Sequence, residues 1–145
     1  MTSHSLCRPM DIQRYEHGEG DFWQRLGPFF ASMQVQRELG LPMRSDESFT
    51  WWLAEENGTV LGFNAAERQK NGVVLLRHAW TQPDWREKGV YTALFDRRLA
   101  DLKEDGHTRF RATTSDPALQ VVKDRGFKKK RERGQYTVLE LTLDE

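Results

Sequence analysis

Two Asn-Gly pairs, at residues 57–58 and 71–72, constrain the fold more than any other feature of the sequence. An Asn-Gly pair favours the tight turn that joins neighbouring antiparallel strands, because both residues tolerate positive φ angles. The runs around these turns, at residues 49–55, 59–67 and 73–81, are rich in the aromatic and β-branched side chains typical of strands. The sequence therefore predicts a meander of three antiparallel strands.

Helical periodicity comes before the meander and returns after it. Between Asp21 and Leu39 apolar side chains recur every three or four residues, and Gly27-Pro28 predicts that this stretch divides there into two helices. A short strand is expected before these helices, at residues 10–15, and a longer helix after the meander, at residues 88–104.

The rest of the chain predicts three strands and one more helix. Residues 109–114 read as a strand, and residues 127–133 and 136–143 as a final hairpin. Between them, Ser115-Asp116-Pro117 predicts a helix start, with Ser115 as the capping side chain and proline in the first turn, where its missing N–H is not needed.

The predicted order is therefore β-α-α-β-β-β-α-β-α-β-β, with about seven strands and about four helices. A strand-helix-strand unit in the middle is expected to pair in parallel inside a mainly antiparallel central sheet, because such a crossover joins parallel strands. The fold class is α/β, or α+β in the other convention. At 145 residues the chain has the size of one domain, so we expect a single domain over residues 1–145.

Composition narrows the function only slightly. The 22 lysine and arginine residues balance the 22 aspartate and glutamate residues, so net charge gives no argument for a polyanionic partner. The basic residues are concentrated in the second half, where the run 128–131 is Lys-Lys-Lys-Arg. We expect anionic ligands there, or else a solvated surface.

Location and metal content follow from what the sequence contains. Cys7 is the single cysteine, which we expect to be a free thiol, and no His/Cys cluster has the spacing of zinc ligands. We see no apolar core of a signal peptide and no segment that could span a bilayer. The sequence predicts a cytoplasmic protein with no metal and no membrane partner.

The turn at residues 83–91 is where we expect chemistry. A chain that leaves a strand, turns and enters a helix presents unpaired N–H groups and the positive end of the helix dipole, and a pyrophosphate fits that place. Gly89 would let the backbone approach such a ligand, and Arg86 and Lys88 add positive charge. The alternative is an ordinary helix start with an arginine in its loop.

The wider context favours the ligand site. The segment Pro83-Asp84-Trp85-Arg86-Glu87-Lys88-Gly89-Val90 resembles the acetyl-CoA-binding motif of the GNAT N-acetyltransferase superfamily. Downstream, Asp116-Pro117-Ala118 and Asp124-Arg125-Gly126-Phe127 are similar to that family's second conserved segment, which ends in a Gly-Phe pair. The resemblance extends from about Met10 to Leu143, and it implies acetyl-CoA as the acyl donor.

The resemblance also implies a donor site. Backbone N–H groups around residues 88–92 would hold the pyrophosphate, with charge from Arg86 or Lys88. The strand ending at residue 81 would splay away from the strand at 109–114, and the pantetheine arm would lie in the gap. The implied donor-binding residues are Ala79, Trp80, Thr81, Arg86, Glu87, Lys88, Gly89, Val90, Tyr91, Thr92 and Ser115.

Two positions depart from the family's pattern. Tyr91 stands where the family usually has a small residue, which crowds the far side of the turn. Val122 stands where the family often has the tyrosine that protonates the leaving thiolate, and Ser115 where it often has asparagine. The general acid would then be Ser115, Tyr91 or water, or the chemistry differs from ordinary acetyl transfer.

Direct transfer also needs a base, because an amine is mostly protonated at neutral pH. His78 aligns with the strand position where family members often carry an acidic base, and the reference pKa of histidine suits the task. Glu67 is a weaker candidate. The alternative is that His78 is a partly buried sheet residue bonded to the backbone.

We expect an acetyl-CoA-dependent N-acetyltransferase whose partners are acetyl-CoA and an amine acceptor of unknown identity. One alternative is a GNAT-like enzyme that modifies nucleic acid bases, which the basic second half and Val122 leave open. The other is a non-catalytic module that binds acyl-CoA.

Trp51 and Trp52 should point to opposite faces of the sheet, so that one packs in the core and the other packs likewise or lines an acceptor cleft. A homodimer is also expected to be possible.

Overall fold

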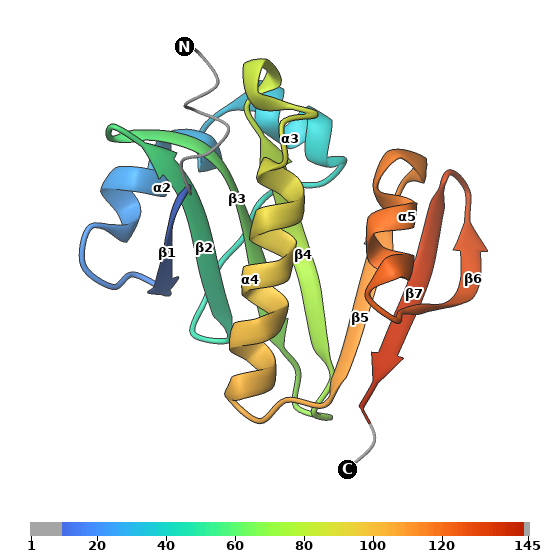
Figure 1. The fold of residues 1–145 in the computed structure, drawn as a ribbon. Coiled ribbons are helices and arrows are strands. Elements are labelled where there is room, and N and C mark those ends of the chain that lie inside the picture. Colours follow the sequence, from blue (N-terminus) through green and yellow to red (C-terminus); the bar gives the residue numbers. More distant parts are fainter. Residues whose placement is uncertain (1–9, 144–145) are drawn as a thin grey trace.

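The computed structural model describes residues 10–143, which form one seven-stranded sheet flanked by helices (Figure 1). Cys7 lies outside the described residues. The strands are β1 (Asp11–Glu16), β2 (Phe49–Glu56), β3 (Thr59–Arg68), β4 (Val74–Thr81), β5 (Arg109–Thr114), β6 (Lys128–Arg133) and β7 (Tyr136–Thr142). The helices are α2 (Phe22–Phe30), α3 (Met33–Leu39), α4 (Val90–Glu104) and α5 (Asp116–Asp124), with a short 3-10 turn, η1 (Pro83–Trp85), before α4.

The sheet has the strand order β1-β2-β3-β4-β5-β7-β6. All neighbours pair antiparallel except β4 and β5, which are joined through α4 and pair in parallel. The predicted meander is confirmed, and Asn57 and Gly58 have the positive φ angles of a tight hairpin turn, 52° and 82°. The predicted fold class and element order are therefore correct.

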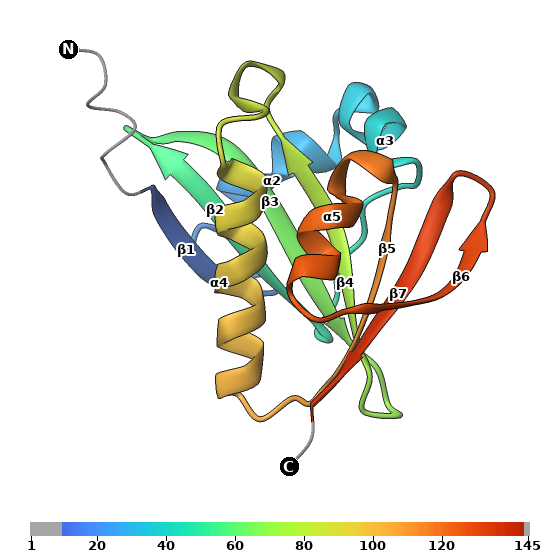
Figure 2. The same cartoon turned by 45° about the vertical axis from the view of Figure 1, so that its right-hand side comes forward.

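Helices cover both faces of the sheet (Figures 1 and 2). The first core lies under α4 and α5 and includes Trp52, Phe95 and Phe110. The second core lies under α2 and α3 and includes Trp51 and Phe63. The two tryptophans thus point to opposite faces, as alternation predicts, and both are fully buried. The prediction that they pack in the core is confirmed, and the alternative of an acceptor-cleft wall is excluded by this burial.

Two local expectations are also wrong. Gly27 and Pro28 lie inside α2 instead of dividing it. The break comes at Ser32, whose hydroxyl accepts a hydrogen bond from the Val35 N–H at 3.2 Å and so begins α3. Ser115 does precede α5, but its side chain makes no capping hydrogen bond. None of the helices in the described residues is long and apolar enough to cross a membrane.

Candidate active site

The turn before α4 leaves backbone N–H groups open at the helix start. Gly89 caps α4 with a φ of 91°, in the left-handed region, and Glu87 has a φ of 64°. The first hydrogen bond of the helix runs from the Ala93 N–H to the Gly89 carbonyl, so the N–H groups of residues 90–92 have no acceptor within the helix. No side chain caps this end of α4, and a Cβ atom at Gly89 would meet nothing within 4 Å in the described chain. The backbone N–H groups predicted to bind a phosphate are therefore unobstructed within the described residues.

The two cations near this turn are placed differently. The Lys88 ammonium lies 5.5 Å from the ring centre of Trp85 and has no acidic partner in residues 10–143. Arg86 folds back toward α3: its Nε donates to the Thr81 carbonyl at 2.9 Å and its Nη2 to Glu38 at 2.7 Å. The charge of Arg86 is therefore shared with a carboxylate, and Lys88 is the freer cation.

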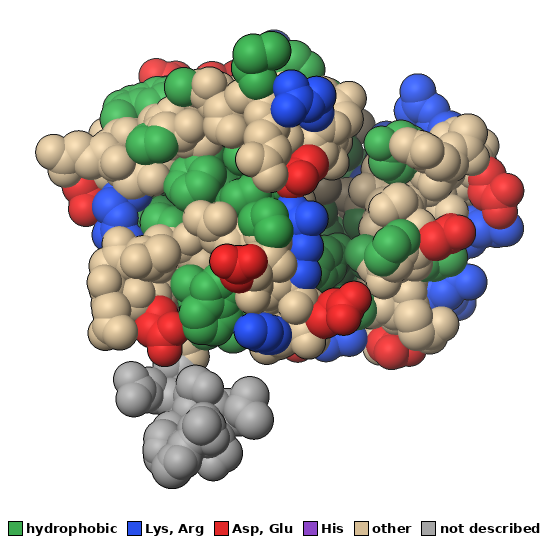
Figure 3. Space-filling model, turned by 90° about the horizontal axis from the view of Figure 1, so that it is seen from above, with side chains coloured by type: hydrophobic (Ala, Val, Ile, Leu, Met, Phe, Trp, Pro, Cys, Tyr) green, Lys and Arg blue, Asp and Glu red, His purple; other side chains and the backbone are tan. Residues whose placement is uncertain are grey.

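Beside this helix start, β4 and β5 separate, as the resemblance implied. They pair only at Val74–Phe110, Leu75–Arg111 and Leu76–Ala112. From Arg77 onward the facing edge of β4 has no strand partner, although the carbonyls of Arg77 and Thr81 accept hydrogen bonds from Arg98 and Arg86. Seen from above, a hollow with hydrophobic and basic atoms separates the larger part of the molecule from the lobe that carries α5 (Figure 3).

A β-bulge interrupts β4 at the level where the strands diverge. Asn64 of β3 faces both His78 and Ala79 of β4, and His78 has a φ of 56°. By simple alternation His78 and Trp80 would share the face of Leu76, which packs in the first core. The extra residue instead turns both rings toward the second core and leaves Ala79 exposed.

His78, a candidate base, is held between aromatic rings. It is 7% exposed, and its ring stacks on Phe49 and Trp51 at centroid distances of 5.9 and 5.6 Å. Its Nε2 accepts the Arg44 N–H at 3.3 Å, and its Nδ1 is buried without a partner in the described residues. Burial, together with the positive charges of Arg77 and Arg44, lowers the pKa of His78 to about 4. The ring is neutral at neutral pH and a weak base; its catalytic role stays a prediction.

Glu67, the weaker candidate, is engaged in ion pairs. Its carboxylate accepts hydrogen bonds from Arg77 Nε at 2.8 Å and from Arg44 Nη2. Two guanidinium partners occupy the lone pairs of this carboxylate. The arrangement fits a structural tie between β3, β4 and the loop after α3.

A groove of about 470 Å³ lies on the α2 and α3 side of the end of β4. Its lining residues are Pro28, Phe29, Ser32, Gln34, Val35, Trp80, Gln82, Pro83 and Asp84. Glu38 secures its wall, because Glu38 Oε1 accepts the Trp80 indole N–H at 2.8 Å as well as the Arg86 guanidinium. These bonds lower the pKa of Glu38, with the Arg86 hydrogen bond as the largest cause. Glu38 was missed in the sequence because α3 and β4 meet only in the folded chain.

The candidate acids occupy different walls. Ser115 is exposed at the start of α5, whereas Val122 is fully buried in the first core. Tyr91 is half-buried on the first turn of α4 and packs against that same core, with its ring stacked on Phe95 at 6.1 Å. The structure therefore places a phenol on the wall opposite Val122.

The fold and the family profile that matches this chain define an acyl-transfer enzyme. A family profile described as acetyltransferase (GNAT) domain matches residues 24–142, and the chain therefore belongs to the GNAT acetyltransferase family. A search of curated protein sequences gives no match.

Solved structures show the same fold at low sequence identity. A GNAT-family acetyltransferase from Staphylococcus aureus is 17% identical with a TM-score of 0.67, covering 92% of this chain and 100% of that chain. The GNAT domain of S. lividans PAT is 18% identical with a TM-score of 0.71, covering 92% and 90%. N-acetylglutamate synthase from Neisseria gonorrhoeae, complexed with coenzyme A and N-acetyl-glutamate, is 16% identical with a TM-score of 0.68, covering 95% of this chain and 36% of that chain.

Proposed function

We propose that this protein transfers an acetyl group from acetyl-CoA to an amine by direct attack. The observation that carries the proposal is the set of open N–H groups at the start of α4, beside the end of β4, where β4 is no longer paired with β5. Anions bind at such helix ends through N–H groups and the helix dipole. The synthase from N. gonorrhoeae, similar in fold, is complexed with coenzyme A, which agrees with this assignment.

Each element has a part in the reaction. The amides of residues 88–92 would hold the pyrophosphate, with Lys88 adding charge. Acetyl-CoA supplies the activated acyl group as a thioester. The open edge of β4 beyond Arg77 offers backbone N–H groups that would polarise the thioester carbonyl, as in an oxyanion hole. Ala79, Trp80, Thr81 and Ser115 would line the rest of the proposed donor path.

The amine would enter from the other face. The groove beside Trp80 opens between α2, α3 and the end of β4, and its lining is partly aromatic and partly amide. An acceptor seated there would approach the opening between β4 and β5 from the side opposite α4. Glu38 would fix the wall instead of acting as base, because the hydrogen bonds from Arg86 and Trp80 lower its pKa and so make it a weaker proton acceptor.

The donor site is tested by thermal unfolding with acetyl-CoA and CoA. Gly89→Glu puts a carboxylate at the open N–H groups, so stabilisation by either ligand should be lost. The matched control is Gly72→Glu, because Gly72 also has a positive φ of 87° with nothing within 4 Å, but lies in the β3–β4 turn. If both variants keep the parent's ligand-induced shift, the turn is not the donor site.

The acceptor is tested by thiol release from acetyl-CoA against amines, peptides and oligonucleotides. Release with small amines or peptides supports the proposal. Release with oligonucleotides alone, lost at raised salt, would assign base modification instead. Tight CoA binding without release on any amine would assign a non-catalytic module. A cytoplasmic location and a homodimer stay predictions.

A further inference from the structure

A buried arginine of α4, Arg98, lies over the β3–β4 bulge, at the level where β4 leaves β5. Arg98 of α4 is 2% exposed, whereas its neighbour Arg97 is exposed. Arg98 Nη1 donates to the carbonyl of Ala65 at 2.9 Å and of Arg77 at 3.4 Å, and its Nε is buried with no partner among the residues that the structure describes. Within residues 10–143 it forms no ion pair with a carboxylate. A buried charge is normally paired, so this one is available to an incoming negative charge.

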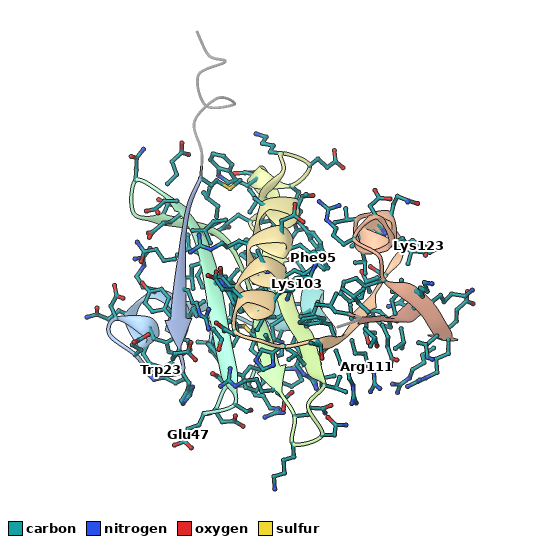
Figure 4. The ribbon with its side chains drawn as sticks, turned by 60° about the horizontal axis from the view of Figure 1, so that its bottom comes forward. Trp23, Glu47, Phe95, Lys103, Arg111 and Lys123 are labelled. Carbon is teal, nitrogen blue, oxygen red and sulfur yellow. The ribbon has the colours of Figure 1, made fainter. Side chains whose placement is uncertain are left out.

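The position of Arg98 relates it to the proposed donor path. Arg77 is the first residue of β4 beyond the three that pair with β5, so the guanidinium lies where the two strands begin to separate. It also lies over the ring of Phe95, 5.1 Å from the ring centre. Figure 4 shows Phe95 on the side of α4 that faces α5, which agrees with its edge contact to Phe127.

Tyr91 brings a hydroxyl to the same level. Tyr91 and Arg98 are two helical turns apart on one side of α4, and both rest on Phe95. The Tyr91 side chain lies near Thr114, at the end of β5, whose side chain lowers the pKa of Tyr91. Because Leu76 pairs with Ala112 in parallel, Thr114 lies about level with His78. The phenol therefore lies at the height of the β4 bulge.

The charged groups around the phenol are all cationic. Burial raises the pKa of Tyr91, while the charge of Arg98, the Thr114 side chain and Arg125 oppose the increase. Arg125 reaches from the end of α5, but its guanidinium is paired with Asp96 at 2.7 Å. Arg98 is thus the buried cation whose charge is not already matched by a carboxylate in the described chain.

We propose that Tyr91 is the proton donor to the leaving sulfur and that Arg98 is the positioning residue that stabilises the negative charge there. Val122 on α5 has no proton to donate, so it cannot serve as the acid. Tyr91 on α4 would take that role. As the carbon–sulfur bond breaks, its electron pair stays on sulfur and Tyr91 Oη gives its proton to that sulfur. The tyrosinate then takes up the proton that the attacking amine loses, so charge and protons balance. This inference rests on the proposed function.

The test uses the thiol of bound CoA and needs no acceptor. The ultraviolet absorbance of the thiolate, followed against pH, gives the thiol pKa of CoA bound to the full-length protein. A positive charge and a hydrogen-bond donor both favour the thiolate, so the thiol pKa should lie below that of free CoA. Arg98→Met and Tyr91→Phe should each raise it, by about one unit or more for Arg98→Met. Arg98→Lys, which keeps the charge, should restore most of the shift.

Two controls separate this role from a structural one. Tyr15→Phe removes a hydroxyl from another buried tyrosine, bonded to Gln13 on β1, and should leave the thiol pKa at the parent value. If Arg98→Met does not fold, Tyr91→Phe decides by itself, because it keeps the packing on Phe95: a thiol that titrates as in the parent then overturns the inference. Bound CoA whose thiol titrates alike in the parent and in both Tyr91→Phe and Arg98→Met overturns the inference. A parent that does not bind CoA overturns the proposed function itself.

Discussion

A Cβ atom on Gly62 would lie 2.7 Å from the carbonyl oxygen of Trp80, and this close approach holds β4 against β3 just above the bulge. The same Cβ would lie 3.1 Å from Val90, the first residue of α4. Both distances are shorter than ordinary contacts. Gly62 therefore sets how closely the start of α4 and the end of β4 can lie, and so the shape of the proposed donor site.

Gly62→Ala should lower the free energy of unfolding by about 1–3 kcal/mol, because the added methyl must displace backbone or Val90. It should also weaken CoA binding, since it moves the start of α4 relative to β4. Gly27→Ala is the control: it lies inside α2 with nothing within 4 Å. That change should raise the free energy of unfolding by roughly 0.5–1 kcal/mol and leave CoA binding unchanged. Urea unfolding and calorimetric titration measure both effects. Equal behaviour of the two variants would contradict the role of Gly62.

His78 should make stability depend on pH between 6.5 and 4. Its pKa falls from 6.5 to about 4 on folding, so the folded state favours the neutral ring. The stabilisation of the folded state by the neutral His78 ring is complete above pH 6.5 and is lost as the pH falls toward 4. The total is about 3 kcal/mol.

His78→Asn removes this dependence while keeping a residue that tolerates a positive φ. Urea unfolding at several pH values between 4 and 7 compares the variant with the parent. A parent curve as flat as the variant's over that interval would show that the ring is not held neutral.

The ion pair between Glu38 and Arg86 predicts a salt-dependent effect on donor binding. Glu38→Gln removes a negative charge near the proposed pyrophosphate site and frees Arg86, while an amide oxygen can still accept the Trp80 N–H. The affinity for CoA should rise about two- to fivefold at low salt, the size of an exposed charge effect. The gain should shrink at high salt. An unchanged or lower affinity at low salt would mean that Glu38 supports the site only by packing.

Local signals explain what could be predicted of the fold. The Asn-Gly turn at 57–58 and the helix start at Gly89 depend on the backbone freedom of a few neighbouring residues, so they are visible in the sequence. The sequence predicts the break between the two helices at Gly27-Pro28, but it comes at Ser32. Pro28 lies near the end of α2, so little of the helix follows it, and Ser32 caps the start of α3. Pro28 and Ser32 are both residue types that favour a break between helices, so only the packing decides at which of them the break falls.

The missed parts of the site depend on contacts between distant segments. The bulge at His78 exists only in the pairing of β4 with β3, and Glu38 becomes important only because α3 lies against β4. Arg98 left a weak signal: it lies four residues after Leu94 and four before Leu102, within the buried stripe of α4. An arginine in an apolar stripe is the pattern that could have identified it.

The central claim is that backbone amides at the start of α4 hold the phosphates of the donor. Proton–nitrogen correlation spectra of labelled protein titrated with CoA report each amide separately. We expect the largest shifts at residues 88–92, with further shifts along the open edge of β4 at residues 77–81. Saturable CoA binding that leaves the amides of residues 88–92 unmoved would contradict the account.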